Sequence, residues 1–513
     1  MIVVAAGAVV KHVIPAGQIG MVTSSRRSLA AISRLRRRAL LQGLGGLAVA
    51  GSLPGAPLRA EAPQWSPQRL LRLAEEAALS RSQVEARIAP LFECADAGFW
   101  RLTVDVYHQC ILGKLRLPDP PLEHPWLTPG GDYVGQWLWD TMFVLDLLSL
   151  LPRHRQTIRG VFQNYWEAQA RWDQAMPADA RGMIPCVILP QRIDAGRWPG
   201  FPAFSQAPLL AWGLERVFRR NGDLALLRDG LGPLERFHDW FWRERDVTDR
   251  GLIAVGAYSG AVEEARFETY DFEADLDDLN LTPHPGRHGT AAVYGDICIP
   301  ANTACLLLAE ASLARLAAAA GDSALAERRQ HRLAKGIAAM RRHMWSQQRG
   351  CFLAVRRDTL QQVPTATIGG FMALPAGIAT QAQAARMAEA LAGAAWATPL
   401  PVPTLDRTDP RYGSTDTWRG DAWPVTNYLV AAGLAAYGHG ARAANIADAI
   451  IDAALRVGIS ERYDSQSGRA LGVAGLGMSC TLVTMALEGL SARRRLVWRR
   501  QGQGPASRSR TRP

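Results

Sequence analysis

The sequence predicts an all-α fold in which helical hairpins follow one another around a toroid. From residue 65 onward, apolar residues recur at helical spacing and the alternation typical of strands is scarce. A helix–turn–helix plan occurs at residues 209–244 and is repeated at residues 301–345. Long aromatic and acidic connections separate the helices, so we expect them to line one end of the ring.

The two hairpins share a turn in which glycine is followed by aspartate. Gly222 and Gly321 suit the left-handed residue that ends a helix. Asp223 and Asp322 suit the capping position at the start of the next helix. Further amphipathic helices are expected at residues 384–396 and 441–458.

The basic charge of the chain lies mostly at its ends. Residues 1–62 carry a net charge of +7 and residues 493–513 carry +8, so a total of +11 leaves about −4 for the body. A mildly acidic body argues against a phosphate-binding surface, and no nucleic-acid partner is expected. Residues 493–513 are predicted to form a basic disordered tail.

Residues 1–62 are predicted to be an export signal and leader. A cluster of arginines precedes an apolar, glycine-rich run at 39–53 that is too short to span a bilayer comfortably. Arg37 and Arg38, followed by Ala39, resemble a twin-arginine signal. The expected location is therefore periplasmic or secreted, without a stable membrane span. An uncleaved anchor or a later start at Met21 are the alternatives.

Seven cysteines show neither a CxxC pair nor a regular framework. Twin-arginine substrates fold before export, so mostly free, buried thiols are expected, and cysteine is not expected to bind metal.

The loops between the predicted helices combine aromatic and polar side chains. Examples are GGDYVGQWLWDTMF at 130–143 and YGSTDTWRGDAWPVTNYL at 412–429. Aromatic faces stack on the apolar faces of sugars, while carboxylates, amides and arginine bind hydroxyl groups. These loops therefore predict a carbohydrate pocket.

Four of these segments resemble, in the same order, signature segments of the inverting (α/α)6-barrel glycosidases. They are QWLWDTMF (136–143), SQAPLLAW (205–212), WRGDAWPVTNYL (418–429) and ERYD (461–464). The relatives are glycoside hydrolase families 63 and 37, which include processing α-glucosidases, mannosylglycerate hydrolase-like enzymes and trehalases. The resemblance covers about residues 95–490. It implies a six-hairpin (α/α)6 toroid, and we expect the catalytic domain to occupy residues 63–492.

The resemblance also implies roles for individual residues. Glu461 takes the position of the general base. In FETYDFE, Asp271 takes the position of the general acid and Glu268 that of the leading glutamate. The relatives carry a Ser-Gly pair before the acid, and here Ser259-Gly260 lies upstream of FETYDFE. Glu263 and Glu264 are therefore alternative general acids, and the aspartates at 275–278 are the next candidates. Other positions match residues that hold the terminal sugar in relatives: Trp139, Asp140, Gln206, Trp418, Arg419 and Trp423.

The chemistry explains why two distant carboxyl groups are needed. An inverting enzyme protonates the leaving oxygen with one carboxyl and activates water with another, roughly 6.5 to 9.5 Å away. The acid stays protonated near neutral pH if it is buried or lies beside other negative charges. Residues 259–282 hold eight acidic side chains threaded with Tyr270 and Phe272, which favours such an environment.

Several of these residues also have ordinary structural interpretations. Because Trp137 and Trp139 are two apart at a helix start, we expect one to point inward and the other toward the pocket. Arg419 either contacts substrate or pairs with Asp416 or Asp421. Tyr463 and Asp464 are expected to be turn residues.

No cofactor or metal is predicted. The acidic stretch offers oxygen ligands for a divalent cation, but it lacks the glycine and the spacing of a calcium loop. Whether it binds calcium is therefore left open. His284 and His288 are four apart, but Pro285 and Gly286 between them deny the helix that a zinc pair needs.

The sequence therefore predicts an exported, exo-acting inverting glycosidase that removes a terminal α-linked glucose or related hexose from an oligosaccharide or small glycoside. A catalytically inactive sugar-binding toroid is one alternative. A sugar epimerase or polysaccharide lyase is another, although the loops are short of the histidines such enzymes use as proton-transfer bases. The sugar, its linkage and the oligomeric state are left open.

Overall fold

The computed structural model describes residues 65–176, 178–190, 204–246, 248–258, 281–284, 292–413 and 418–499. The chain divides into two compact units, residues 1–67 and 68–513. The helix α2 (Pro67–Ala77) begins at that boundary, and α3 (Arg81–Ile88) follows it. The predicted leader at residues 1–62 lies outside the described residues, and everything below concerns the second unit.

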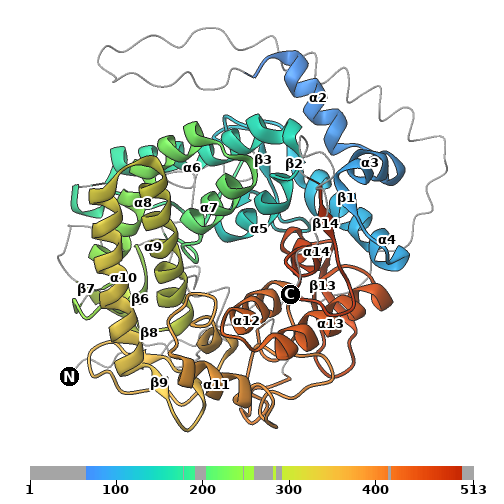
Figure 1. Cartoon of the computed structure of the whole chain (residues 1–513). Coiled ribbons are helices and arrows are strands. Elements are labelled where there is room, and N and C mark those ends of the chain that lie inside the picture. The colour runs from blue at the N-terminus through green and yellow to red at the C-terminus, as the bar shows by residue number, and fades with distance from the viewer. Residues whose placement is uncertain are drawn as a thin grey trace, which may run out of the picture. The chain divides into compact units, whose positions relative to one another are not determined.

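In this unit, outer helices alternate along the chain with inner segments, and together they follow a ring (Figure 1). The outer helices are α4 (Ala97–Val106), α6 (Arg155–Ala175), α8 (Leu224–Glu244), α10 (Ser323–His343), α11 (Gln381–Ala390) and α13 (Gly440–Val457). The inner segments are α5 (Leu138–Leu148), α7 (Leu210–Asn221), α9 (Pro300–Ala320), the 3-10 turn η7 (Ile368–Phe371), α12 (Pro424–Ala436) and α14 (Thr481–Leu487). The predicted toroid of helical hairpins is confirmed.

Burial distinguishes the inner helices from the outer ones. All the residues of α5 are buried, whereas α10 buries mainly one face. The inner helices α5 and α7 cross closely because Gly213 leaves no room for a Cβ, which would lie 2.3 Å from Sδ of Met142. One described helix, α9, is long and apolar enough to cross a bilayer, but 72% of its apolar window is buried inside the protein. This helix therefore forms part of the core.

Both predicted hairpin turns are confirmed. Gly222 ends α7 with φ of 64° and Gly321 ends α9 with φ of 87°, which are left-handed conformations that favour glycine. Asp223 caps α8 by accepting a hydrogen bond from the amide of Leu226, and Asp322 caps α10 in the same way.

Asp223 also binds Arg159 of α6 through both carboxylate oxygens, at 2.7 and 2.5 Å. Burial raises the pKa of this carboxyl, but the hydrogen bonds from Arg159 and the helix amide outweigh burial and leave the pKa below its ordinary value. Asp223 therefore joins two neighbouring hairpins as well as capping its own helix.

We expect Asp223→Ala to lower the free energy of unfolding by about 2 to 3 kcal/mol, because it removes a cap and a buried partner of arginine. The matched variant Asp322→Ala removes only an exposed cap and costs about 1 kcal/mol. Because the pKa of Asp223 is lowered on folding, the difference between the two variants is present above about pH 4 and shrinks as the pH falls. Denaturant unfolding at pH 7 and pH 3 measures this difference. Equal losses for both variants would contradict the role of Arg159.

The ring is closed by strands from opposite ends of the unit. Strand β1 (Phe92–Glu93) pairs antiparallel with β14 (Val497–Trp498), and α13 packs against α4. Arg493 and Arg494 each form an ion pair with Asp452 at 2.8 Å. The prediction that a disordered tail begins at residue 493 is therefore wrong for residues 493–499, because these arginines pair with acids on α13. Residues 500–513 lie outside the described residues.

Short strands occur at several places around the ring and were not predicted (Figure 1). The largest sheet has the order β11 (Val355–Arg356), β8 (Ala292–Cys298), β6 (Ala254–Tyr258), with β7 (Leu281–His284) also paired to β8. The other two-stranded pairs are β2 (Leu115–Arg116) with β3 (Trp126–Leu127), β4 (Gln136–Trp137) with β5 (Val187–Ile188), β9 (Trp345–Ser346) with β10 (Cys351–Phe352), and β12 (Ser460–Tyr463) with β13 (Ala470–Ala474). The acidic segment of the sequence runs between β6 and β7.

The seven cysteines are thiols rather than disulfides, and all except Cys94 are buried, as predicted. Burial raises the pKa of Cys110 to about 12, and it does the same for Cys298 and Cys305, so these side chains stay protonated. Among the described residues, no three His, Cys, Asp or Glu side chains gather as metal ligands would.

Candidate active site

The predicted site residues in the described part of the structure lie where inner helices begin. Trp139 and Asp140 are in the first turn of α5, Gln206 shortly precedes α7, and Trp423 immediately precedes α12. Glu461 lies on β12, beside the segment that leads into α12, because Ala422 and Tyr463 form a β-bridge. Segments far apart in the sequence therefore meet at one end of the ring.

Glu461 is 3% exposed and is held by two hydrogen bonds. The hydroxyl of Tyr133 donates to its Oε1 at 3.0 Å, and the amide of Val473 donates to its Oε2 at 2.8 Å. The guanidinium of Arg462 lies 3.6 Å from Oε2. Donors to both oxygens hold the carboxylate in one orientation. Each oxygen keeps a lone pair that could accept a hydrogen bond from water, so the group is suited to act as a base.

The carboxylate of Glu461 packs against the backbone of β13 at Gly472. A Cβ on this residue would lie 2.1 Å from Oε2 of Glu461, and its φ of +71° is one that favours glycine. The pairing of β12 with β13 is irregular between Ser460 and Arg462, around Glu461 itself. The local backbone is therefore shaped around this one carboxylate.

We expect Gly472→Ala to lower kcat/KM about 100-fold. The new methyl group displaces the carboxylate of Glu461, and catalysis is sensitive to such a displacement of a reacting group. Gly489→Ala is the matched control, since Gly489 has a φ of +72° but no atom within 4 Å of the added Cβ. Both variants should stay folded in thermal melting, with the larger loss of stability in Gly472→Ala, and only this variant should lose activity. Equal activity of the two variants would contradict the role assigned to Gly472.

Tyr133 contacts Glu461, and Trp137 contacts Tyr133. Their rings meet edge to face at 5.9 Å, and the indole of Trp137 is only partly buried. Its Nε1 donates to the carbonyl of Val134 at 3.2 Å, which fixes the ring. The two aromatic side chains pack together, and Tyr133 connects them to the candidate base. Neither was among the residues assigned to the site, although both lie in a loop whose aromatic content predicted sugar binding.

We expect Tyr133→Phe to lower kcat about tenfold, because Glu461 loses one of the two donors that orient it, and hydrogen bonds to charged groups contribute about 1.5 to 3 kcal/mol. Tyr437→Phe is the control, since the Tyr437 hydroxyl donates to the carbonyl of Ala379 at 2.6 Å near the end of α12. Steady-state kinetics on both variants provide the comparison. A kcat unchanged by Tyr133→Phe would show that this hydrogen bond does not matter for the reaction.

Trp139 and Gln206 connect α5 to the segment before α7. The side chain of Trp139 is 1% exposed and meets Phe143 edge to face at 5.8 Å, so it points inward. Its amide donates to Oε1 of Gln206 at 3.0 Å. Of the two tryptophans at the start of α5, Trp137 rather than Trp139 therefore has the indole that remains accessible to a ligand. Asp140 is 6% exposed in the first turn of α5.

The segment at 418–423 forms a second wall. The indoles of Trp418 and Trp423 stack in parallel with centroids 4.0 Å apart, and the guanidinium of Arg462 lies 5.8 Å from the centroid of the Trp423 ring. Nε of Arg462 donates to Asp421 at 2.6 Å. Burial raises the pKa of Asp421 and the bond from Arg462 opposes that rise. Asp421 thus pairs with Arg462, whereas the carbonyl of the half-buried Arg419 accepts a hydrogen bond from the amide of Gly413 at 2.7 Å.

The turn after Glu461 is confirmed as structural. The hydroxyl of Tyr463 donates to the carbonyl of Gly458 at 2.8 Å. Oδ1 of Asp464 accepts from the amides of Gln466 and Ser467, and hydrogen bonding from the Ser467 amide lowers the pKa of Asp464.

The remaining predicted residues lie outside the described residues: Asp271, Glu268, Glu263 and Glu264, together with Asp416. The distance between the carboxyl group of Glu461 and that of the general acid therefore stays a prediction.

Comparisons with known proteins show which family and which solved structures the chain resembles. The model of the mannosylglycerate hydrolase MGH1-like glycoside hydrolase domain matches residues 133–479, which begin at Tyr133 and include Glu461. Mannosylglycerate hydrolase MGH1 of Selaginella moellendorffii is 23% identical over 457 residues, covering 79% of this chain and 89% of the relative. Trehalase of Oryctolagus cuniculus is 32% identical over 122 residues, covering 24% of this chain and 18% of the relative.

A solved structure with the same fold is that of the GH63 mannosylglycerate hydrolase from Thermus thermophilus in complex with Tris. It aligns with a TM-score of 0.56 at 20% identity and covers 74% of this chain and 97% of that one. The (α/α)6 toroid is therefore shared with a glycoside hydrolase of known structure.

Proposed function

Because the chain belongs to the family of mannosylglycerate hydrolase MGH1-like glycoside hydrolase domains and is thus a glycoside hydrolase, we propose that it is an exo-acting, inverting enzyme that removes a terminal α-linked hexose from a small glycoside. The observation that carries this proposal is the environment of Glu461. A single buried carboxylate, held on both oxygens by Tyr133 and Val473, is what water activation requires.

In the proposed reaction, Glu461 removes a proton from a water molecule as that water attacks the anomeric carbon. Asp271 donates its proton to the leaving oxygen, and the two steps occur together through an oxocarbenium-like transition state. Attack from the face opposite the leaving group inverts the anomeric configuration. The partly exposed indole of Trp137 lies against Tyr133, which contacts the base, and it could stack on the apolar face of the sugar.

Among small glycosides, an α-mannosyl or α-glucosyl glycerate is the favoured substrate. This choice is supported by the extent of the likeness, since the plant mannosylglycerate hydrolase covers 79% of this chain and the rabbit trehalase 24%. Trehalose is the second candidate, because that shorter likeness reaches 32% identity.

Proton NMR of a reaction mixture tests the proposal directly. The purified protein is incubated with mannosylglycerate, glucosylglycerate, trehalose and a panel of α- and β-linked disaccharides, and the first-formed anomer is recorded. Release of the β-anomer from an α-glycoside is the expected result. Trehalose should give equal amounts of β-glucose from the attacked residue and α-glucose from the leaving residue. Release of the attacked hexose as the α-anomer would contradict inversion, an altered epimer would indicate an epimerase, and binding without turnover would indicate an inactive sugar-binding protein.

We further propose export through the segment around Arg37 and Arg38, on the strength of the sequence pattern alone. In a host with a twin-arginine pathway, the full chain should reach the periplasm, and the double variant Arg37→Lys, Arg38→Lys should remain in the cytoplasm. Equal distribution of both proteins between the fractions would contradict this route.

A further inference from the structure

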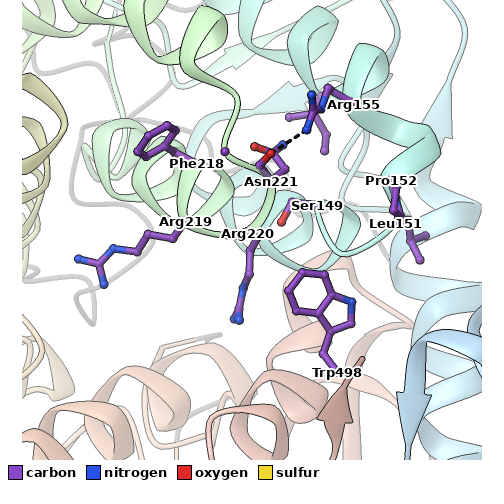
Figure 2. A pocket seen from close by; sticks show the side chains of 11 residues that line it. Ser149, Leu151, Pro152, Arg155, Phe218, Arg219, Arg220, Asn221 and Trp498 are labelled. Atoms are coloured by element: carbon purple, nitrogen blue, oxygen red, sulfur yellow. Dashed lines mark hydrogen bonds between the residues drawn. The ribbon is translucent and has the colours of Figure 1, made fainter. Parts of the chain in front are cut away.

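A second pocket lies at the other end of the inner helices from Glu461. It has a volume of about 380 Å³ and is formed where α5 ends, α6 begins, α7 ends and β14 runs past them (Figure 2). Asp140 is in the first turn of α5, whereas Ser149, which lines the pocket, follows the last turn of the same helix. At a rise of about 1.5 Å per residue, the two sites are separated by roughly the length of this helix.

A layer of aromatic side chains lies between the two ends. Phe143 of α5 meets Trp139 on the side of the candidate active site, at 5.8 Å. It also meets Trp212 at 5.2 Å and Tyr428 at 6.4 Å, which come from α7 and α12. These aromatic side chains pack around Phe143, which lies between Asp140 and Ser149 along α5. A ligand in the second pocket therefore does not reach Glu461.

The second pocket is positively charged. Among the described residues, its lining contains Arg155, Arg219 and Arg220 and no acidic side chain. Nη2 of Arg155 donates to the carbonyl of Asn221 at 2.7 Å, and the rest of this guanidinium is exposed to solvent. Nε of Arg220 faces Asp146 at 3.4 Å, and Arg219 is turned away toward Glu215 (Figure 2). Arg155 thus has no acidic partner among the described residues, whereas Arg220 shares Asp146 with Arg216.

The neutral groups of the pocket complement these charges. Nδ2 of Asn221 is buried and has no hydrogen-bond acceptor among the described residues. The hydroxyl of Ser149 donates to the carbonyl of Asp146 at 2.6 Å and can still accept a hydrogen bond. The indole of Trp498 stands beside Ser149 and Arg220 (Figure 2). A buried amide, a hydroxyl and an aromatic face are the groups that bind a sugar ring.

We propose that this pocket binds a phosphorylated monosaccharide, with the phosphate at Arg155 and the sugar ring against Trp498. Arginine is suited to phosphate because its fork of donors can bind two oxygens at once. The volume lies within the range of about 300 to 1,000 Å³ that is usual for small-molecule sites. This proposal concerns residues outside the candidate active site and does not depend on the proposed function.

Isothermal titration calorimetry of the full chain with glucose 6-phosphate tests the proposal. We expect saturable binding that Arg155→Gln weakens about tenfold, because a charged partner of the phosphate is lost. Arg328→Gln is the matched control, since Arg328 is an exposed arginine on α10 that is not in this pocket, and it should bind as the unaltered protein does. Glu461→Gln should also bind normally, which separates this pocket from the candidate active site. Thermal melting establishes that each variant is folded.

Three results would overturn the proposal. The first is the absence of binding by the unaltered protein. The second is binding that Arg155→Gln leaves unchanged or that Glu461→Gln abolishes, since the ligand would then lie elsewhere. The third is equal affinity for inorganic phosphate and glucose 6-phosphate, because the sugar ring would then contribute nothing. Weaker binding of both inorganic phosphate and unphosphorylated glucose is the supporting outcome.

Discussion

Glu461→Gln is expected to lower kcat about 1,000-fold or more on any substrate that the protein hydrolyses. The amide of glutamine cannot accept the proton of the attacking water, and general base catalysis typically contributes between about 100- and 10,000-fold. The change keeps the size of the side chain and its acceptor for Tyr133, so the fold should be retained. Steady-state kinetics and thermal melting of the same preparations measure both effects.

Two further observations make this prediction specific to a base. Glu389→Gln, which changes a glutamate of α11 that is 68% exposed, should leave kcat unaltered. Sodium azide should restore part of the activity of Glu461→Gln by acting as the nucleophile in place of activated water, since a small anion can occupy the space beside the neutral amide. Turnover by Glu461→Gln at the rate of the unaltered protein would remove Glu461 from the mechanism.

Asp271→Asn should reduce hydrolysis of a natural glycoside by a similar factor while sparing substrates with good leaving groups. A glycosyl fluoride or a dinitrophenyl glycoside departs without being protonated, so it does not need the general acid. The ratio of kcat/KM for the fluoride to that for the natural glycoside should therefore rise about 100-fold or more in Asp271→Asn. Glu461→Gln should lower both rates, because water still has to be activated.

The same ratio distinguishes Asp271 from its alternatives. Glu263→Gln and Glu264→Gln should leave it near the value of the unaltered protein. If one of these variants shows the raised ratio and Asp271→Asn does not, the general acid is that glutamate. If none of the three changes the ratio, the aspartates at 275–278 are the next residues to replace.

The features that the sequence predicted well depend on local physical rules. Gly222 and Asp223 could be assigned as the end of one helix and the start of the next, because a left-handed residue and a capping carboxylate have recognisable signatures. The resemblance to known glycosidases assigned Glu461 and the segment at 418–429 to the same site. The structure brings these together through the bridge of Ala422 to Tyr463.

The features that sequence reasoning missed depend on contacts between distant residues. Nothing local to Tyr133 indicates that its hydroxyl reaches Glu461, and nothing local to Gly472 indicates that a carboxylate packs against it. Arg493 and Arg494 looked like a charged tail because their partner, Asp452, lies on a helix that ends well before them. The sheet of β6, β7, β8 and β11 was missed for the same reason, since short strands gain their stability from pairing.

The pairing of Phe92 with Trp498 sets a condition on how the molecule forms. A contact between the two ends of a domain is the most non-local kind that a chain can make. Such contacts slow folding, because the chain loses the entropy of a long loop before the contact forms. During synthesis, β1 leaves the ribosome long before β14 has been translated. Strand β1 of the nascent chain therefore stays unpaired until the end of synthesis. Truncated chains that stop short of Val497 should therefore be recovered as open, chaperone-bound or proteolysed species.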